Sequence, residues 1–485
     1  MNSRWLGLIT VFGLLLVVIA FDGGGRLNTE INNLNNDEAL KHGIWGLCVI
    51  DIDSGNVVGS NLPDKCVIPA STLKVLTTGA AMGLLGKDYR YTTYIEYDGE
   101  FDKTTGVISG NLYIRGTGDP TLESSAFPMR GDTISEFQSL GIRLKRMGVK
   151  KINGMIIGDQ SLFSDNPLPD GWSWGDLGQY YGAGTSALAY KDNKVVLHYN
   201  TTKGDTAKLT SVVPQPRNVN YHSFVTCEGA KDEAYVYGAP YGSDFRIYGS
   251  IPKGKADYEV EAAHPQPALQ CAEELKRILN TVGITSGEAR IYTQEDKAKD
   301  KTERKPLTTL TSPKLSDIIV HVNKKSDNVY AEQLLRTLGA VKGNGGTTES
   351  GTAVVKSYWQ SQGVDVSGMN LTDGSGLSRS NLVTTRQMAT VLYKISKMPW
   401  FKEFDASLPV AGKEGSMTSL CKGTCAENNL RAKTGYINRA RGYAGYVKTK
   451  SGKLVAFSLL ANNYTCTPTE MKKKLEKVMV GIAEM

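Results

Sequence analysis

A serine and a lysine three residues apart form the first pair in this chain that can do nucleophilic chemistry. Ser71 and Lys74 lie in the segment 69–74 (PASTLK), and an apolar run follows as far as Gly86. Residues three apart on a helix share a face, so the Lys74 amine can reach the Ser71 hydroxyl. Burial, or a nearby charge such as Lys433, would lower the lysine pKa enough to make it a base. The pair predicts acyl transfer by Ser71; the alternative is a helix cap beside a solvated charge.

A second polar group, Ser326-Asp327-Asn328, comes directly before an apolar helical pattern. We expect Ser326 and Asn328 to project from a loop. The Ser326 hydroxyl would then relay a proton, and the Asn328 amide would hold the substrate backbone. The alternative is that these residues cap the helix that follows them.

A third group, Lys433-Thr434-Gly435, precedes the strand-like segment 442–448. A strand edge at this place would pair with an extended peptide, with Lys433 and Thr434 facing the carboxylate of that peptide. Gly435 would let the substrate approach the backbone closely. The alternative for Lys433 is a solvated surface charge.

The elements that must position these groups alternate between helical and strand patterns, which predicts an α/β (α+β) protein. The segment 46–59 reads as a β-hairpin, and the apolar run after Ser71 reads as a buried helix. Many short strand patterns from about residue 89 to 292 predict inserted strand-rich modules. Further helices are expected at 134–147, 268–282, 329–338, 351–362 and 467–482, and further strands at 91–95, 154–158, 194–199, 442–448 and 453–460.

Bulk properties place the chain among ordinary globular proteins of several domains. It has 485 residues, of which 40% are hydrophobic and 22% charged, and a formal net charge of +7. The basic residues are scattered rather than gathered into runs with interleaved aromatic residues, which argues against a nucleic-acid partner. The mild basic excess is compatible with peripheral contact to an anionic membrane or cell wall.

The N-terminus has the pattern of an export signal. Arg4 precedes the apolar run 5–21, which ends near the small residue Ala20 and is followed by a polar, glycine-rich stretch. This predicts a signal peptide over residues 1–20 and an exported, periplasmic or cell-envelope protein. The alternative is an uncleaved membrane anchor, because the run is near the lower limit for a spanning helix.

Cysteine and histidine usage gives no metal-binding pattern. Seven cysteines are present, an odd number, and the five histidines show no metal-ligand spacing. Cys421 and Cys425 are close enough to form a disulfide if residues 422–424 make a turn. We expect structural cysteines, no metal site and no cofactor.

The order S-x-x-K, S-D-N, K-T-G is that of β-lactamases and penicillin-binding proteins. With segments 118–122 (GDPTL), 373–379 (DGSGLSR) and 432–435 (AKTG), the chain resembles the S13 peptidase family, the class C low-molecular-mass penicillin-binding proteins. The resemblance implies a β-lactamase-like, penicillin-recognising transpeptidase-like domain split by two inserted strand-rich modules. The expected divisions are 28–88 with 286–485 for the catalytic domain, 89–104 with 187–285 for one module, and 105–186 for the other.

The resemblance also implies roles for residues outside the three motifs. Backbone N–H groups of Ser71 and Tyr436 would form the oxyanion hole. Asp176, in the aromatic-rich loop 169–176, would meet the amino group at the end of a diaminopimelyl side chain, and Arg379 its carboxylate. The chain departs from the family pattern at Tyr436, where a smaller residue is common, and at Ser416-Met417, where relatives often show Thr-Leu.

Together these features predict a serine D-Ala-D-Ala carboxypeptidase or DD-endopeptidase acting on peptidoglycan stem peptides. Ser71 would attack the penultimate D-Ala carbonyl, with Lys74 as base and Ser326 passing the proton to the leaving D-Ala. β-Lactam antibiotics would act as acylating inhibitors. The alternatives are a serine β-lactamase, which the large insertion disfavours, and a non-catalytic module that binds cell-wall peptides, which the intact motifs disfavour.

Overall fold

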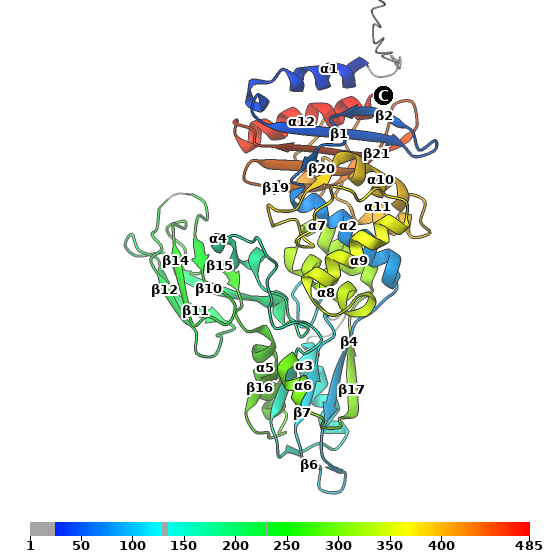
Figure 1. Cartoon of the computed structure of the whole chain (residues 1–485). Coiled ribbons are helices and arrows are strands. Elements are labelled where there is room, and N and C mark those ends of the chain that lie inside the picture. The colour runs from blue at the N-terminus through cyan, green and yellow to red at the C-terminus, as the bar shows by residue number, and fades with distance from the viewer. Residues whose placement is uncertain (1–24, 129–133, 229) are drawn as a thin grey trace, which may run out of the picture.

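The computed structural model describes residues 25–128, 134–228 and 230–485. They form a large body and two smaller modules (Figure 1). The expected signal segment, residues 1–20, lies outside the described residues. Over the described ranges, no helix has the length and apolar character needed to cross a membrane.

A five-stranded antiparallel sheet in the order β19-β20-β21-β1-β2 forms the centre of the body. Its inner strands β1 and β21 are near-continuous apolar runs because both of their faces are buried. The strand bounds are β1 Ile44–Asp51, β2 Val57–Asn61, β19 Arg431–Ile437, β20 Ala440–Lys448 and β21 Leu454–Asn462.

Helices cover both faces of this sheet. The helices α1 (Gly25–Asn35) and α12 (Pro468–Ala483) share one apolar core with the sheet, so the first and last described elements lie side by side. A second core, on the other face, is built with the remaining helices of the body. They are α2 Lys74–Leu85, α7 Leu315–Lys325, α8 Asn328–Lys342, α9 Thr348–Ser361, α10 Thr385–Ile395 and α11 Phe401–Ser407, with the short strands β3 Cys66–Val67 and β18 Val383–Thr384 beside them.

The first inserted unit, here called the mixed-sheet module, has a sheet in the order β16-β9-β7-β4-β17. Helix α5 (Pro267–Thr281) packs on this sheet, and its apolar face joins that of α3 (Glu136–Arg146) in one core. The remaining elements are β4 Thr92–Tyr97, β5 Phe101–Asp102, β6 Val107–Ile108, β7 Leu112–Arg115, β8 Lys151–Ile152, β9 Ile156–Asp159, β16 Ala289–Tyr292, α6 Gln294–Lys299 and β17 Lys305–Thr311.

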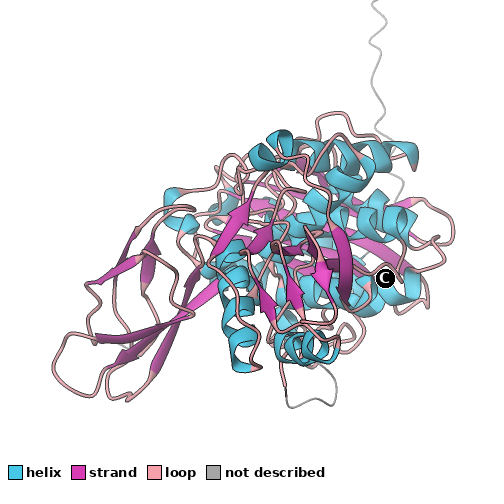
Figure 2. Ribbon diagram, turned by 90° about the horizontal axis from the view of Figure 1, so that it is seen from below, coloured by secondary structure: helices cyan, strands magenta, loops and turns pink. Residues whose placement is uncertain are grey.

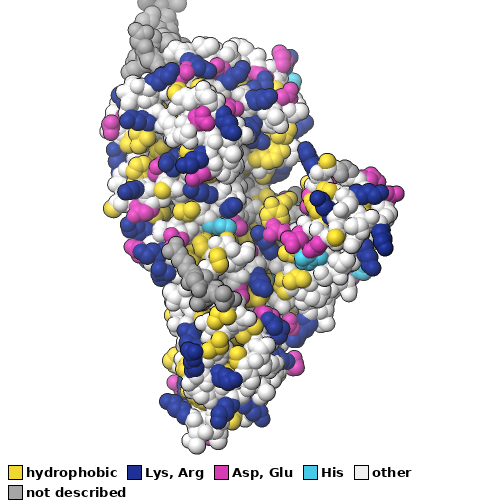
Figure 3. All heavy atoms as spheres, turned by 180° about the vertical axis from the view of Figure 1, so that it is seen from behind, with side chains coloured by type: hydrophobic (Ala, Val, Ile, Leu, Met, Phe, Trp, Pro, Cys, Tyr) yellow, Lys and Arg dark blue, Asp and Glu magenta, His cyan; other side chains and the backbone are white. Residues whose placement is uncertain are grey.

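The second inserted unit, here called the all-β module, is nested within the first. Seen from below, its strands project to one side of the molecule, and from behind an indentation separates it from the body (Figures 2 and 3). It has its own apolar core between two three-stranded sheets. The strands are β10 Lys194–Asn200, β11 Lys208–Val213, β12 Asn220–Ser223, β13 Tyr235–Tyr237, β14 Asp244–Tyr248 and β15 Tyr258–Ala263.

The strand pairing corrects the expected domain boundaries. Strands β4 and β7 pair directly, so no boundary falls between residues 104 and 105. Strand β17 pairs with β4, so the segment after residue 286 begins in the mixed-sheet module and not in the catalytic body. The boundaries were wrong because partners in this sheet come from distant parts of the chain, which local patterns do not encode.

The expected helices and strands are otherwise present to within a few residues, including the hairpin of β1 and β2. Cys421 and Cys425, which the sequence left able to pair, are both free thiols. A turn does join them, since the Thr424 N–H donates to the Cys421 carbonyl. Cys421 is buried in the core beneath α12, and burial raises the pKa of its thiol to about 12.

Candidate active site

Ser71 lies in a short 3₁₀ turn, Ala70–Leu73, that runs directly into α2. Ala70 has a left-handed φ of 47°, which a residue with a Cβ rarely adopts and which is typical of functional sites held under strain. Lys74 Nζ donates to Ser71 Oγ over 3.0 Å. The predicted pair therefore lies within hydrogen-bond reach, as the spacing of three residues requires.

Lys74 is completely buried and is held in one orientation by three acceptors. Besides Ser71, its amine donates to Asn328 Oδ1 and to the Ser375 carbonyl, each over 2.7 Å. Burial lowers the pKa of Lys74 to about 8. Nearby carboxylates of Asp373, Glu332 and Asp327 oppose that shift. A lysine with this pKa exists partly as the neutral amine near pH 7, so it can accept a proton.

The second motif occupies the junction of α7 and α8. Ser326 ends α7 in a left-handed conformation with φ of 62°, and Asn328 is the first residue of α8. The expected capping role belongs to Asp327, whose side chain accepts from the Tyr330 N–H. Asn328 uses its oxygen to accept from Lys74 and its nitrogen to donate to the Tyr181 carbonyl over 2.9 Å. The tight turn thus leaves the Ser326 and Asn328 side chains free to face the site.

The third motif lies within β19, the edge strand of the sheet, and directly ahead of β20, the strand expected at 442–448. Lys433 is buried and its Nζ donates to Ser326 Oγ over 2.8 Å. Burial and the charge of Lys74 lower the pKa of Lys433 well below its usual range. A solvated surface role for Lys433 is excluded by this burial.

Gly435 has a structural role in addition to the one expected. A Cβ at this position would lie 2.7 Å from the Pro69 carbonyl oxygen, 2.9 Å from the Thr72 nitrogen and 3.1 Å from the Ser71 nitrogen. The absent side chain therefore lets β19 lie directly against the turn that carries the nucleophile. Any larger residue would push the two apart.

Two further residues extend the β19 side of the site. Tyr436 is 48% exposed, and the Arg441 guanidinium lies 4.7 Å from the centre of its ring. Ser416 Oγ and Thr434 Oγ1 are 2.7 Å apart. Ser416, the first residue of the Ser416-Met417 departure, therefore contacts the third motif directly. The place of Ser416 in the site could not be predicted from the sequence, where it stood out only as a departure from the family pattern.

Glu332, which no sequence motif marks, positions the loop whose Ser375 carbonyl accepts from Lys74. Glu332 is completely buried, and its carboxylate accepts from the backbone N–H groups of Gly374 and Ser375 over 2.8–3.0 Å. Burial and the charge of Asp373 raise the pKa of Glu332 to about 8. Its position four residues after Asn328 could have indicated that Glu332 belongs to the site, because residues four apart share a helix face.

The aromatic-rich loop 169–176 lies against the same region. Trp172 Nε1 donates to Asp373 Oδ2 over 3.0 Å, and Gly171 contacts the Ser378 side chain. Asp176, in the short helix α4 (Trp174–Leu177), is half-buried and accepts from the Tyr181 hydroxyl over 3.0 Å. Because the Tyr181 carbonyl accepts from Asn328, Asp176 is two contacts away from the second motif.

Arg379 is exposed and donates to the Asn438 carbonyl over 3.0 Å, at the turn that follows β19. In the part of the chain that the structure describes, Arg379 forms no salt bridge. Its neighbour Ser378 contacts the loop that carries Asp176, so the two segments expected to hold the diaminopimelyl end lie together.

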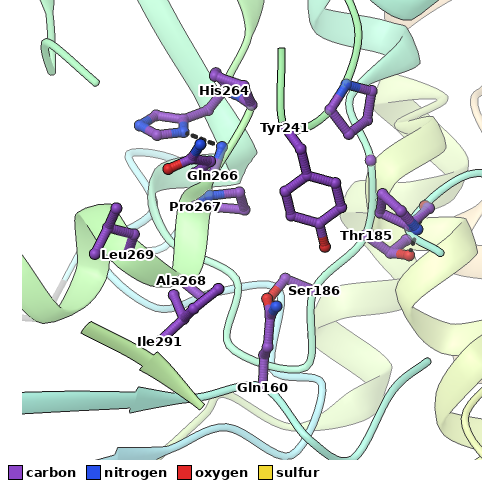
Figure 4. Close-up of a pocket in the computed structure, with 14 residues that line it drawn as sticks. Gln160, Thr185, Ser186, Tyr241, His264, Gln266, Pro267, Ala268, Leu269 and Ile291 are labelled. Carbon is purple, nitrogen blue, oxygen red and sulfur yellow. Dashed lines mark hydrogen bonds between the residues drawn. The ribbon is translucent and has the colours of Figure 1, made fainter. Parts of the chain in front are cut away.

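A pocket away from this site lies where the two inserted modules meet (Figure 4). His264 is one of the residues that line it, and its Nδ1 accepts from the Gln266 N–H over 3.0 Å. Burial lowers the pKa of His264 to about 4, so the ring is neutral near pH 7. Tyr241, Gln160 and Ser186 complete a polar wall, in which the Ser186 hydroxyl donates to Gln160 Oε1 over 3.0 Å.

Among the described residues, one group of side chains has ligand atoms spaced closely enough for a metal ion. His198, Asp257 and Glu259, on and beside β10 and β15, bring these atoms within 4.8 Å of one another. His198 Nδ1 and Asp257 Oδ1 lie 2.9 Å apart and both carboxylates are exposed, so the group has the character of a hydrogen-bonded surface cluster.

The body and the three motifs gathered at its sheet edge define a penicillin-recognising serine enzyme with a β-lactamase-like fold. The chain belongs to the D-Ala-D-Ala carboxypeptidase 3 (S13) family, whose model matches residues 27–485. The predicted family and the predicted enzyme class, a serine-type D-Ala-D-Ala carboxypeptidase, are confirmed.

Similar proteins span most of the chain. The D-alanyl-D-alanine carboxypeptidase of Actinomadura sp. (strain R39) is 27% identical over 457 residues, which cover 91% of this chain and 81% of that protein. D-alanyl-D-alanine carboxypeptidase DacB of Haemophilus influenzae is 27% identical over 473 residues, covering 96% and 95%. The crystal structure of penicillin binding protein 4 (dacB) from Haemophilus influenzae shares the fold, with a TM-score of 0.77 at 24% identity, over 96% of this chain and 100% of that one.

Proposed function

We propose that this protein cleaves the terminal D-Ala from peptidoglycan stem peptides through an acyl-enzyme on Ser71. Lys74 takes the Ser71 proton as Oγ attacks the penultimate D-Ala carbonyl carbon. The tetrahedral intermediate collapses when the C–N bond breaks, and the leaving D-Ala amine receives a proton through Ser326. Water then hydrolyses the ester. The same steps on a cross-link between D-amino acids would give a DD-endopeptidase.

One observation carries this proposal: a buried lysine of lowered pKa lies 3.0 Å from the serine at the start of α2. A serine hydroxyl needs such a base to attack near neutral pH. The second pair, Lys433 and Ser326, gives the proton a further path. A non-catalytic binding module would have no need for either arrangement.

The oxyanion hole is proposed at the contact between β19 and the nucleophile turn. Gly435 brings β19 within van der Waals contact of the Ser71 nitrogen, and Tyr436 follows it. Backbone N–H groups of Ser71 and Tyr436 would then face the developing negative charge. As an exposed edge, β19 would pair with the peptide, and Lys433 with Thr434 would face its free carboxylate.

We expect benzylpenicillin to acylate Ser71 and to stay attached. In class A β-lactamases a carboxylate activates the deacylating water. The three carboxylates around Lys74 each accept backbone N–H groups instead: Asp327 from Tyr330, Glu332 from Gly374 and Ser375, and Asp373 from Gly376. Intact-mass measurement over time should show a stoichiometric increase that persists for many minutes. Peptide mapping should place it on Ser71.

The matched control is Ser71→Ala, which should show no mass increase. Rapid disappearance of penicillin without an accumulated adduct would identify the protein as a β-lactamase instead. No reaction at all with the wild-type chain would support the non-catalytic binding module.

The acylation rate should rise with pH and level off above about pH 8. The base is the neutral form of Lys74, and its pKa of about 8 means that the neutral fraction falls about tenfold per pH unit well below that value. Stopped-flow acylation between pH 6 and 9.5 measures the profile. A rate that stays constant from pH 6 to 9 would contradict the assignment of Lys74 as base.

Asp176 is proposed to bind the amino group, and Arg379 the carboxylate, at the end of a diaminopimelyl side chain. That end is a zwitterion, so one fixed charge of each sign would pair with it. Asp176→Ala should remove most of the preference in kcat/KM for a peptide with free diaminopimelate over the same peptide acetylated on the side-chain amine. The loss should be about 1.5–3 kcal/mol, as for a hydrogen bond to a charged group.

Asp170→Ala, an exposed carboxylate in the same loop, is the control and should leave the preference unchanged. Penicillin acylation should be nearly normal in both variants. If Asp176→Ala weakens both peptides equally, the residue supports the loop through Tyr181 and does not select the substrate.

The expected compartment is the cell envelope, where peptidoglycan is found. The export pattern of residues 1–20 supports it. N-terminal sequencing of the protein from a secreting host distinguishes cleavage near Ala20 from a retained anchor.

A further inference from the structure

The outer face of one sheet in the all-β module is covered with aromatic side chains. In the sheet β12-β14-β13, Val236, Phe245 and Ile247 point into the module core. The alternating residues point outward, and among them Tyr235 is opposite Tyr248 across the strand pair. The fold buries its apolar residues on the inner face, so the outward rings are not required to complete the core.

Four of these rings form a continuous row. The ring centres of Trp174 and Tyr237 are 6.5 Å apart, those of Tyr237 and Tyr248 are 6.0 Å apart, and those of Tyr248 and Phe224 are 5.1 Å apart with nearly parallel planes. Trp174, Tyr248 and Phe224 are 59%, 42% and 52% exposed. We call Trp174, Tyr237, Tyr248 and Phe224 the aromatic row. Large exposed apolar groups that lie in contact with one another mark an interaction surface.

The aromatic row begins in the loop that lies against the active-site region. Trp174 starts α4, within the loop whose Trp172 donates to Asp373. Asp373 in turn holds the loop whose Ser375 carbonyl accepts from Lys74. From Trp174 the row leads outward along the module. A ligand that extends beyond the reacting peptide can therefore continue onto the row without leaving the protein surface.

The side chains on the outer face of this sheet indicate which class of ligand it binds. Charged and polar groups lie on the same face as the rings, with Arg246 opposite Tyr237 and His222 opposite Arg246. A lipid chain would need an uninterrupted apolar surface. A sugar ring presents an apolar C–H face to an aromatic ring and hydroxyl groups to the polar side chains around it. The face therefore suits a carbohydrate.

We propose that the aromatic row binds the glycan strand of the cell wall. This inference rests on the proposed function, in which the reacting stem peptide is attached to such a strand. Several sugars stacked on successive rings would hold the polymer while its peptide reaches Ser71. The row would then favour polymeric peptidoglycan over free peptides.

The test uses the full-length mature protein and glycan strands stripped of their stem peptides as the probe. Tyr248→Ala combined with Phe224→Ala should weaken binding of the stripped strands roughly tenfold, the scale expected when two aromatic contacts are lost. The rate at which the double variant hydrolyses intact sacculi should fall as well. Penicillin acylation and kcat/KM on a soluble pentapeptide should be unchanged, which also shows that the variant is folded.

Tyr241→Ala is the matched control, because Tyr241 is 50% exposed but lies at the pocket between the modules (Figure 4). It should bind the strands normally. The proposal is overturned if the double variant binds stripped strands as tightly as the wild type, or if the wild type binds only peptide-bearing fragments. Failure of the wild type to react with penicillin would instead count against the proposed function, because glycan binding does not depend on acylation.

Discussion

Lys74→Ala should lower the rate of penicillin acylation by about 10²–10⁴-fold, the usual contribution of a positioned general base. Lys74 Nζ is the only side-chain amine that donates to Ser71 in the described structure, and its pKa of about 8 suits it to accept the proton. Time-resolved intact mass and a stopped-flow assay with a chromogenic β-lactam measure the rate. Circular dichroism should show a retained fold.

Lys87→Ala is the control, because Lys87 lies just beyond the end of the same helix and is partly exposed. It should acylate at the wild-type rate. Lys433→Ala should mainly weaken reaction with substrates that carry a free carboxylate. A Lys74→Ala variant that acylates at the normal rate would show that another group removes the Ser71 proton.

Glu332→Ala should lower the free energy of unfolding by about 2–6 kcal/mol, since each buried N–H left without an acceptor costs about 1–3 kcal/mol. The two donors are the backbone amides of Gly374 and Ser375. The loss should also slow acylation, because the Ser375 carbonyl is one of the three acceptors that orient Lys74. Chemical denaturation and the acylation rate measure the two effects.

Glu332→Gln keeps an acceptor oxygen in the same place and should recover part of both losses. Glu349→Ala, at an exposed position in the first turn of α9, should change stability by less than about 0.5 kcal/mol. If Glu332→Ala is as stable and as reactive as the wild type, the loop of Gly374 and Ser375 holds its position without the carboxylate.

The pairing of Ser71 with Lys74 was predictable from sequence because it depends on local geometry. A spacing of three residues on a helical segment determines which side chains meet, whatever the rest of the chain does. The same holds for the helix that ends at Gly86 and for the hairpin of β1 and β2, whose turn and apolar runs are contiguous. Such features follow from short-range sterics and from the periodicity of burial.

Other parts of the site depend on contacts between distant segments. In the sequence, nothing distinguishes Glu332 from other acidic residues in helices. Its partners Gly374 and Ser375 follow it by 42 and 43 residues, and only the fold brings them into contact with its carboxylate. Gly435 was predicted to admit the substrate, and its second role, admitting the turn at Pro69, became visible only in the structure. The boundary at residue 286 failed for the same reason, because β17 pairs with β4 across about 200 residues. The local sequence determines the secondary structure of each segment. Which segments pack or pair with one another depends on the burial of apolar residues and on backbone pairing over the whole chain.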